Sequence, residues 1–293
     1  MSGETILISP PARLLGREHA ILSGTGRWYH VPDFEGPLSI KTVLRGSAVW
    51  EVESRRFIVH EDMYVVVNDG QKYTITIDSP TPVTTFCVFF KRGFVEDVYR
   101  NRTTPESMLL DDPEKPTSVE FAQHLVPDAP MVQRSLNVLR EGLRTPYSDP
   151  IAALSTLAGH LIGADRQLKG GARSVEAERA GTRQELYRRV LNGRDYLLSH
   201  LTTTVRHEAV ARAAALSPYH FHRVFRRVFG ETPHEYLTRY RLQRAHQLLL
   251  LSALSITDIC FECGFQSPPS FSHLFRRYFG CTPREFRQKS RIR

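Results

Sequence analysis

The chain has 293 residues, of which 41% are hydrophobic and 24% are charged, as expected of a globular protein with roughly two domains. No run of 18 apolar residues occurs, and the first 17 residues lack a basic segment followed by an apolar one, so we expect neither a membrane span nor a secretory signal, and a cytoplasmic location. The four cysteines are too few for a disulfide framework, whereas the formal net charge of +8 hints at a polyanionic partner.

The first hundred residues predict β structure. Short runs rich in β-branched and aromatic residues are separated by turn-forming residues such as Gly46, Gly70 and Pro80. The expected strands are 38–44, 48–52, 56–59, 63–67, 73–77 and 83–90. Many short strands are typical of a small barrel or sandwich, which we assign to residues 1–118.

Two helices are expected in the next segment, 119–168. Apolar residues recur there at helical spacing on either side of Pro146 and Pro150. These apolar residues are Met131, Leu136, Leu139, Leu143, Ile151, Leu154, Leu157, Leu161 and Ile162. The helices either cover the β unit or present an apolar stripe to a second copy of the chain, and both alternatives stay open.

Residues 169–182 are mostly small or charged and predict an exposed linker. The part beyond it, 183–293, has 19 Lys and Arg against 8 Asp and Glu, a net charge of +11. The remaining 20 basic and 23 acidic residues give the rest of the chain a net charge of −3. The basic excess is therefore confined to the carboxyl-terminal part, which favours nucleic acid as its partner.

This basic part contains an internal repeat. Residues 217–236 align without gaps on residues 267–286, and 11 of the 20 positions are identical. Unrelated segments of average composition would share only about one or two. The repeat therefore indicates a duplicated structural unit.

Each copy predicts a helix-turn-helix unit. Ser217 and Ser267 are expected N-caps, each followed by Pro, and Gly230 and Gly280 end the helices. An apolar stripe runs along each helix, and a short apolar helix, 208–214 or 257–263, precedes it after a turn of three or four residues. The polar side of the helix has several Arg and His, with no Asp or Glu from 217 to 230. Such a face suits phosphate and base edges better than plain solvation.

The connection between the two copies predicts one long helix. Residues 233–252 contain no Gly or Pro after the first residue, so about 20 helical residues would span about 30 Å. One turn of B-DNA is about 34 Å. A single chain would therefore set its two recognition helices into successive major grooves on one side of the duplex.

These motifs resemble the AraC/XylS family of transcriptional regulators. The resemblance runs from about residue 185 to residue 287, through the motifs at 216–221, 227–233, 263–267 and 271–283. It implies an α+β multidomain protein whose domain 183–293 binds promoter DNA. It also implies base contacts from Tyr219, His222 and Arg223, and from Pro269, Ser272 and His273 at the matching positions. Because Pro269 has no side-chain donor, we expect the second unit to contribute more to phosphate anchoring. The expected phosphate contacts are Arg226, Arg227, Arg241, Arg276 and Arg277.

The segments 44–52 and 65–73 resemble the small cupin-like β-barrel domains that many of these regulators have. In the family such domains bind an effector, dimerise, or both. The resemblance thus implies a regulator, most often an activator that contacts RNA polymerase. A barrel that only forms a homodimer remains an alternative. The residues proposed to line a ligand pocket are Trp28, Tyr29, Trp50, Tyr64, Tyr73 and Phe86.

A metal-dependent cupin enzyme is the main rival interpretation. Catalytic cupins typically hold the metal through a His-x-His pair and further ligands, whereas His19, His30 and His60 occur singly here. Cys260 and Cys263 have the spacing of zinc ligands, but they lie on a short apolar helix and are expected to be buried small hydrophobes. We therefore assign no catalytic residue, no metal and no cofactor.

Overall fold

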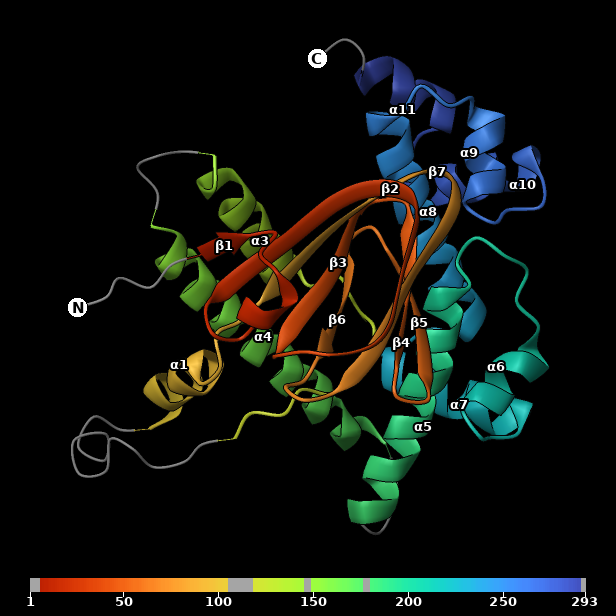
Figure 1. Cartoon of the computed structure of the whole chain (residues 1–293). Coiled ribbons are helices and arrows are strands. Elements are labelled where there is room, and N and C mark those ends of the chain that lie inside the picture. The colour runs from red at the N-terminus through yellow and green to blue at the C-terminus, as the bar shows by residue number, and fades with distance from the viewer. Residues whose placement is uncertain (1–5, 105–117, 145–148, 176–179, 291–293) are drawn as a thin grey trace. The chain divides into compact units, whose positions relative to one another are not determined.

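The computed structural model describes residues 6–104, 118–144, 149–175 and 180–290 (Figure 1). The chain divides into two compact units between Gly170 and Gly171. The division lies inside the predicted linker, 169–182, into which α4 (Pro150–Gly170) and α5 (Ala180–Ser199) extend from either side. Residues 176–179 of that linker, and 105–117 at the end of the predicted β domain, lie outside the described residues.

Within its described part, the first unit contains one mixed sheet of eight strands. These are β1 (Ile6–Ile8), β2 (His19–Glu35), β3 (Ser39–Arg45), β4 (Ser47–Val52), β5 (Arg55–His60), β6 (Met63–Val67), β7 (Lys72–Phe89) and β8 (Val126–Pro127). The order is β1-β2-β7-β3-β6-β8, and β4 pairs with both β5 and β7. The β1–β2 pair is parallel, and the other strand pairs are antiparallel.

The two longest strands, β2 and β7, arch across the sheet side by side (Figure 1). Their register shifts between Gly26 and Trp28, opposite the stretch of β7 that contains Pro80. A bulge tolerates a proline because its residues need not donate to the ladder. The break expected near Pro80 is therefore a bulge within one continuous strand, and the two predicted strands 73–77 and 83–90 are the two halves of β7.

One face of the sheet packs against helices. Side chains on alternate strand positions, such as Ile40, Val66 and Val88, form a core with α1 (Phe94–Thr103), α3 (Pro130–Gly142) and α4. The helical residues in this core include Val95, Val98, Val132, Leu136, Leu139, Leu154, Leu157, Leu161 and Ile162. Two of the expected helices therefore exist as α3 and α4, and both cover the sheet.

The second unit is helical. It comprises the short η2 (Gly171–Ser174), α5, α6 (His207–Ala213), α7 (Pro218–Phe229), α8 (Pro233–Leu251), α9 (Ile256–Glu262), α10 (Pro268–Phe279) and α11 (Pro283–Ser290). The sequence predicts α6 to α10 closely, but it does not predict α5. None of the described helices combines the length and the hydropathy that a membrane crossing requires.

Candidate DNA-binding interface

The first helix-turn-helix consists of α6, a tight turn and α7. The turn closes with a hydrogen bond from Leu216 N to Ala211 O at 3.0 Å. Ala215 enters the left-handed region, with φ of 50°, which only a few non-glycine residues adopt. The turn brings α7 back against α5 and α6, so that the apolar side of α7 is covered and its other side faces outward.

The second helix-turn-helix, α9 and α10, repeats this geometry. Phe265 N donates to Cys260 O at 3.0 Å, and Gly264 takes the left-handed position with φ of 77°. Ala215 and Gly264 thus occupy equivalent places in the two turns. The second turn is one residue longer before its N-cap Ser267.

Both recognition helices begin and end as predicted. Ser217 Oγ accepts from His220 N at 3.3 Å, and Ser267 Oγ accepts from Ser270 N at 3.4 Å. Gly230 and Gly280 end the helices with φ of 75° and 77°. The buried stripes are Phe221, Val224 and Phe225 in α7, and Phe271 and Phe275 in α10. These contacts fix which side of each helix is presented to a partner.

The residues expected to contact bases lie on the exposed sides of these helices. Tyr219 is 79% exposed, and His222 and Arg223 are exposed next to it along α7. On α10, Pro269 and His273 are exposed and Ser272 is half-buried. The side chains of Arg226, Arg227, Arg276 and Arg277 are exposed in the last turns of the two helices. Neither helix contains Asp or Glu, so each outward side is positively charged or neutral.

One unbroken helix, α8, connects the two helix-turn-helix units. It begins with a capping box in which Glu235 N donates to Thr232 Oγ1 at 3.2 Å and Thr232 N donates to Glu235 Oε2 at 2.8 Å. These hydrogen bonds lower the pKa of the Glu235 carboxyl. The 19 residues of α8 span about 28 Å. The length agrees with the helix predicted over 233–252.

Arg241 lies on α8 in a different environment from the other arginines. Its Nε donates to Leu201 O at 2.7 Å and its Nη2 donates to Thr203 O at 2.5 Å. The side chain is half-buried. These contacts tie α8 to the loop between α5 and α6, so Arg241 has a structural task beside its predicted phosphate contact.

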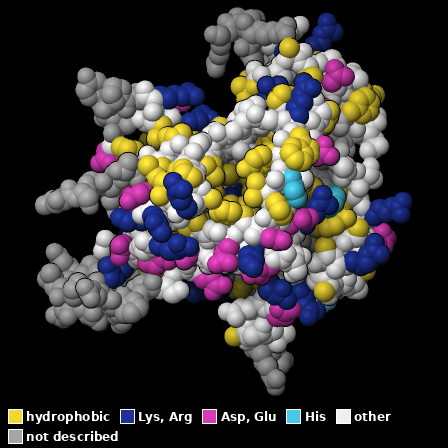
Figure 2. Space-filling model, in the orientation of Figure 1, with side chains coloured by type: hydrophobic (Ala, Val, Ile, Leu, Met, Phe, Trp, Pro, Cys, Tyr) yellow, Lys and Arg dark blue, Asp and Glu magenta, His cyan; other side chains and the backbone are white. Residues whose placement is uncertain are grey.

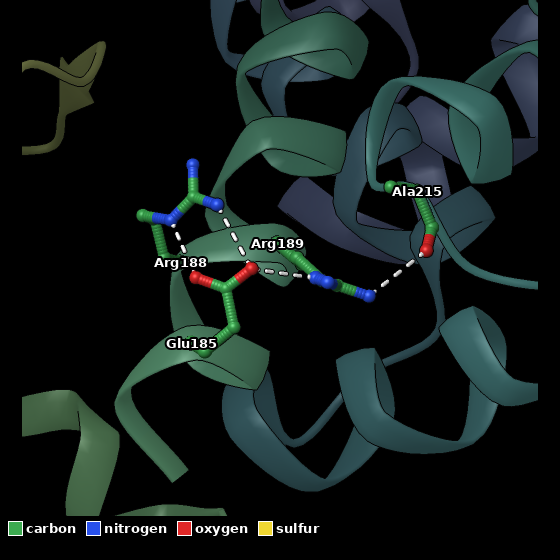
Figure 3. A network of polar contacts seen from close by, with 4 residues as sticks. All are labelled: Glu185, Arg188, Arg189 and Ala215. Carbon is green, nitrogen blue, oxygen red and sulfur yellow. Dashed lines mark hydrogen bonds and ion pairs between the residues drawn. The ribbon is translucent and has the colours of Figure 1, made fainter. Parts of the chain in front are cut away.

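The helix α5 supports the first helix-turn-helix, and sequence reasoning missed it. Arg189 donates two hydrogen bonds, to Glu185 Oε1 at 2.7 Å and to Ala215 O in the turn at 3.4 Å (Figure 3). Arg188 also donates to Glu185, and together the two arginines lower the pKa of this carboxyl to about 2. The recurring apolar residues Tyr187, Val190, Leu191, Leu197 and Leu198 were the signal that could have predicted this helix.

The predicted pocket residues of the first unit divide between the two faces of the sheet. Trp28, Tyr29, Trp50 and Tyr73 line a cavity of about 530 Å³, whose mouth is bordered by hydrophobic side chains in Figure 2. Tyr64 and Phe86 instead belong to the core beneath the helices. Strand alternation explains this division, because residues one position apart point to opposite faces. Sequence reasoning missed Lys41, Cys87 and Phe89, which also line the cavity.

The candidate metal ligands are not gathered. His30 Nδ1 lies 3.1 Å from Thr76 Oγ1, and His19 and His60 are buried at separate places. Cys260 and Cys263 are fully buried in the apolar core of the second helix-turn-helix, beside Phe271. Across the described ranges, no three His, Cys, Asp or Glu side chains are placed to hold a metal ion.

Comparison with known proteins agrees with the geometry of the second unit. A family model described as a helix-turn-helix domain matches residues 210–289. The HTH-type transcriptional activator RhaS of Escherichia coli is 43% identical over 70 residues, which are 24% of this chain and 25% of that protein. The chain thus matches only about a quarter of the length of its curated relatives.

Two solved structures cover the same part. The DNA-binding domain of AdpA, solved in complex with a target DNA, is 31% identical with a TM-score of 0.34, covering 35% of this chain and 93% of that one. An AraC-type regulator from Chromobacterium violaceum is 30% identical with a TM-score of 0.33, covering 38% and 96%.

The second unit is therefore a helix-turn-helix domain of the DNA-binding class. Residues 210–289 thus form a helix-turn-helix domain of the AraC type, which confirms the resemblance seen in the carboxyl-terminal part of the sequence.

Proposed function

We propose that this regulator binds a specific site in promoter DNA through α7 and α10 and activates transcription through contact with RNA polymerase. The observation that supports the proposal is the pair of exposed, acid-free helix sides at the two ends of α8. Tyr219, His222 and Arg223 read bases in one half of the site. Pro269, Ser272 and His273 take the matching place in the other half.

Phosphate contacts supply most of the affinity in this proposal. Arg226, Arg227, Arg276 and Arg277 stand at the ends of the recognition helices, and Arg241 adds to them from α8. Arginine suits this task because its planar guanidinium matches phosphate oxygens. Binding should then weaken as salt concentration rises, because each neutralised phosphate releases counterions.

The first unit regulates this binding in the cytoplasm. We assign it a small-molecule effector, because its sheet encloses a cavity of a size typical of ligand sites. Helices α3 and α4 are the surface that we assign to a homodimer, since Met131 and Val138 on α3 are exposed apolar residues. A first unit that only dimerises would leave DNA binding indifferent to every small molecule.

Genomic DNA capture with the purified full-length chain tests the proposal. We expect enrichment of a small set of promoter fragments, whose binding in gel shifts weakens steeply between 50 and 200 mM salt, as the five proposed phosphate contacts require. A transcription assay on a captured promoter then distinguishes activation from repression. Capture of DNA without sequence preference, or binding that salt leaves unchanged, would overturn the proposal.

A further inference from the structure

The cavity of the first unit contains one charged side chain among its described lining residues. That side chain is Lys41 of β3, which is only 1% exposed. The rest of the lining is mostly aromatic and aliphatic, and it includes no Asp, Glu or Arg. A buried cation without a counter-ion is costly, so its presence in an open cavity requires an explanation.

The surroundings of Lys41 are aromatic. Its Nζ donates to Tyr73 Oη at 2.8 Å and lies 4.0 Å from the centre of the Tyr73 ring and 3.8 Å from that of Phe89. Among the described residues no carboxylate forms an ion pair with it. An ammonium has three N–H donors, and Tyr73 accepts from one of them. The site therefore has spare donor capacity.

Trp50 adds a second donor. Its side chain is fully buried on β4 and lines the same cavity, and its indole Nε1–H has no hydrogen-bond partner within the described part of the chain. A buried tryptophan N–H usually finds an acceptor. The Tyr73 hydroxyl accepts from Lys41, so its own proton is also available for donation. The cavity thus offers donors and lacks an anionic acceptor.

We propose that this cavity binds a small organic carboxylate with an apolar body, whose oxygens accept hydrogen bonds from Lys41, Trp50 and Tyr73. The apolar body packs against side chains such as Val31, Ile75 and Ile77, and Trp28 covers it at the rim, where 74% of this residue is exposed. A carboxylate supplies the missing counter-ion as well as the missing acceptor. The assignment of this ligand as the effector rests on the proposed function, whereas its binding to the cavity does not.

The electrostatics of the cavity set a pH dependence for this binding. Burial lowers the pKa of Lys41 from 10.5 to about 7, while burial raises the pKa of the neighbouring Cys87 thiol and of the Tyr73 hydroxyl. Cys87 and Tyr73 therefore stay protonated at neutral pH. A carboxylate binds the ammonium form of Lys41, so binding takes up a proton once the pH exceeds about 7.

Tryptophan fluorescence of the full-length chain measures this binding directly, because both of its tryptophans, Trp28 and Trp50, line the cavity. The probes are octanoate and 4-phenylbutyrate, each compared with its primary amide, which keeps the shape and removes the charge. We expect saturable binding of at least one carboxylate, with its amide at least tenfold weaker. Equal affinity for acid and amide, or no binding of either acid at millimolar concentration, would overturn the proposal.

Two substitutions test the role of Lys41. Lys41→Met should weaken carboxylate binding at least tenfold, while Lys72→Met, which removes an exposed lysine next to Tyr73, should leave it unchanged. Circular dichroism and thermal unfolding show whether each variant is folded. Unaltered carboxylate binding by folded Lys41→Met would contradict the assignment.

A pH series on the unmodified chain does not depend on any variant. Carboxylate affinity should fall about tenfold per unit above pH 7, while affinity for the amide stays flat. A flat profile for the acid contradicts the role of Lys41. Gel shifts on a captured promoter fragment, run in parallel, separate the two proposals. Carboxylate binding without specific DNA binding overturns the proposed function and leaves the ligand site standing. Specific DNA binding without carboxylate binding overturns the ligand site alone.

Discussion

Gly264 lies so close to Leu201 that a Cβ atom on the glycine would be 2.5 Å from the Leu201 carbonyl oxygen. The same oxygen accepts from Arg241 Nε at 2.7 Å. The loop that follows α5, the middle of α8 and the turn of the second helix-turn-helix therefore meet at one backbone carbonyl. This junction connects α5, which supports the first helix-turn-helix, to the turn of the second helix-turn-helix.

Gly264→Ala should destabilise the second unit by several kcal/mol. The left-handed φ of 77° costs an alanine about 1–2 kcal/mol, and the clash with backbone adds to it. The matched control is Gly280→Ala, which has the same φ of 77° but nothing within 4 Å of the added Cβ. Urea unfolding of both variants measures the difference, and equal losses would show that the contact with Leu201 is unimportant.

Gly193→Ala should destabilise the protein although alanine is the better helix former. Gly193 is inside α5, and a Cβ there would lie 2.3 Å from Cε2 of Phe221 in the recognition helix α7. Gly181→Ala in the same helix meets nothing within 4 Å and should be neutral or slightly stabilising, by up to about 1 kcal/mol. Thermal unfolding checks the pair. A gain in stability for Gly193→Ala would mean that α5 and α7 pack less closely than described.

Arg223→Ala should weaken binding to the specific site by about 1–3 kcal/mol and relax base preference in one half of it. Arg227→Ala, one turn further along α7, should weaken binding to every sequence alike, because a phosphate contact is blind to sequence. Titrations on specific and random duplexes measure both variants. Equal losses on the two duplexes for Arg223→Ala would count against its base contact.

Lys41→Met should stabilise the ligand-free protein near pH 7, and the gain should shrink at higher pH. Because the pKa of Lys41 is lowered to about 7, folding at lower pH buries a charged group at full cost. Between pH 7 and 10.5 the unfolded chain keeps the proton that the folded chain has lost, so the native protein becomes relatively more stable as pH rises.

The expected gain for Lys41→Met at pH 7 is on the order of a few kcal/mol. Urea unfolding at pH 7 and pH 9 measures it, with Lys72→Met as the exposed control. A variant less stable than the original at pH 7 would show that the aromatic contacts of Lys41 outweigh the cost of its burial.

The helical unit could be predicted from the sequence because its signals are local. Ser217, Pro218 and Gly230 mark the ends of one helix within 14 residues, and the repeat shows the same marks again. The strand β2 gave no such signal, since most of its second half is exposed and Gly24, Gly26 and Pro32 interrupt it. Its existence depends on pairing with β7, far along the chain.

The cavity could be predicted only in part, for a related reason. Trp50 and Tyr73 were recognised as pocket candidates by residue type, but residue type does not fix the face of a strand. Tyr64 and Phe86 are on the helix-covered face. Lys41 would be expected in solvent from the sequence, but β3 places it between β6 and β7, where its ammonium lies against Tyr73 and Phe89. These placements follow from the register of distant strands.

The two helix-turn-helix units follow one another along a single chain, and their outward side chains differ: Tyr219, His222 and Arg223 on α7, but Pro269, Ser272 and His273 on α10. A DNA site read by two such different units is asymmetric and has a direction, unlike the palindrome read by a symmetric pair of identical subunits. Inverting the DNA site within a promoter should therefore invert the orientation of the bound protein relative to the start of transcription. A single bound chain would thereby distinguish one direction along the DNA from the other.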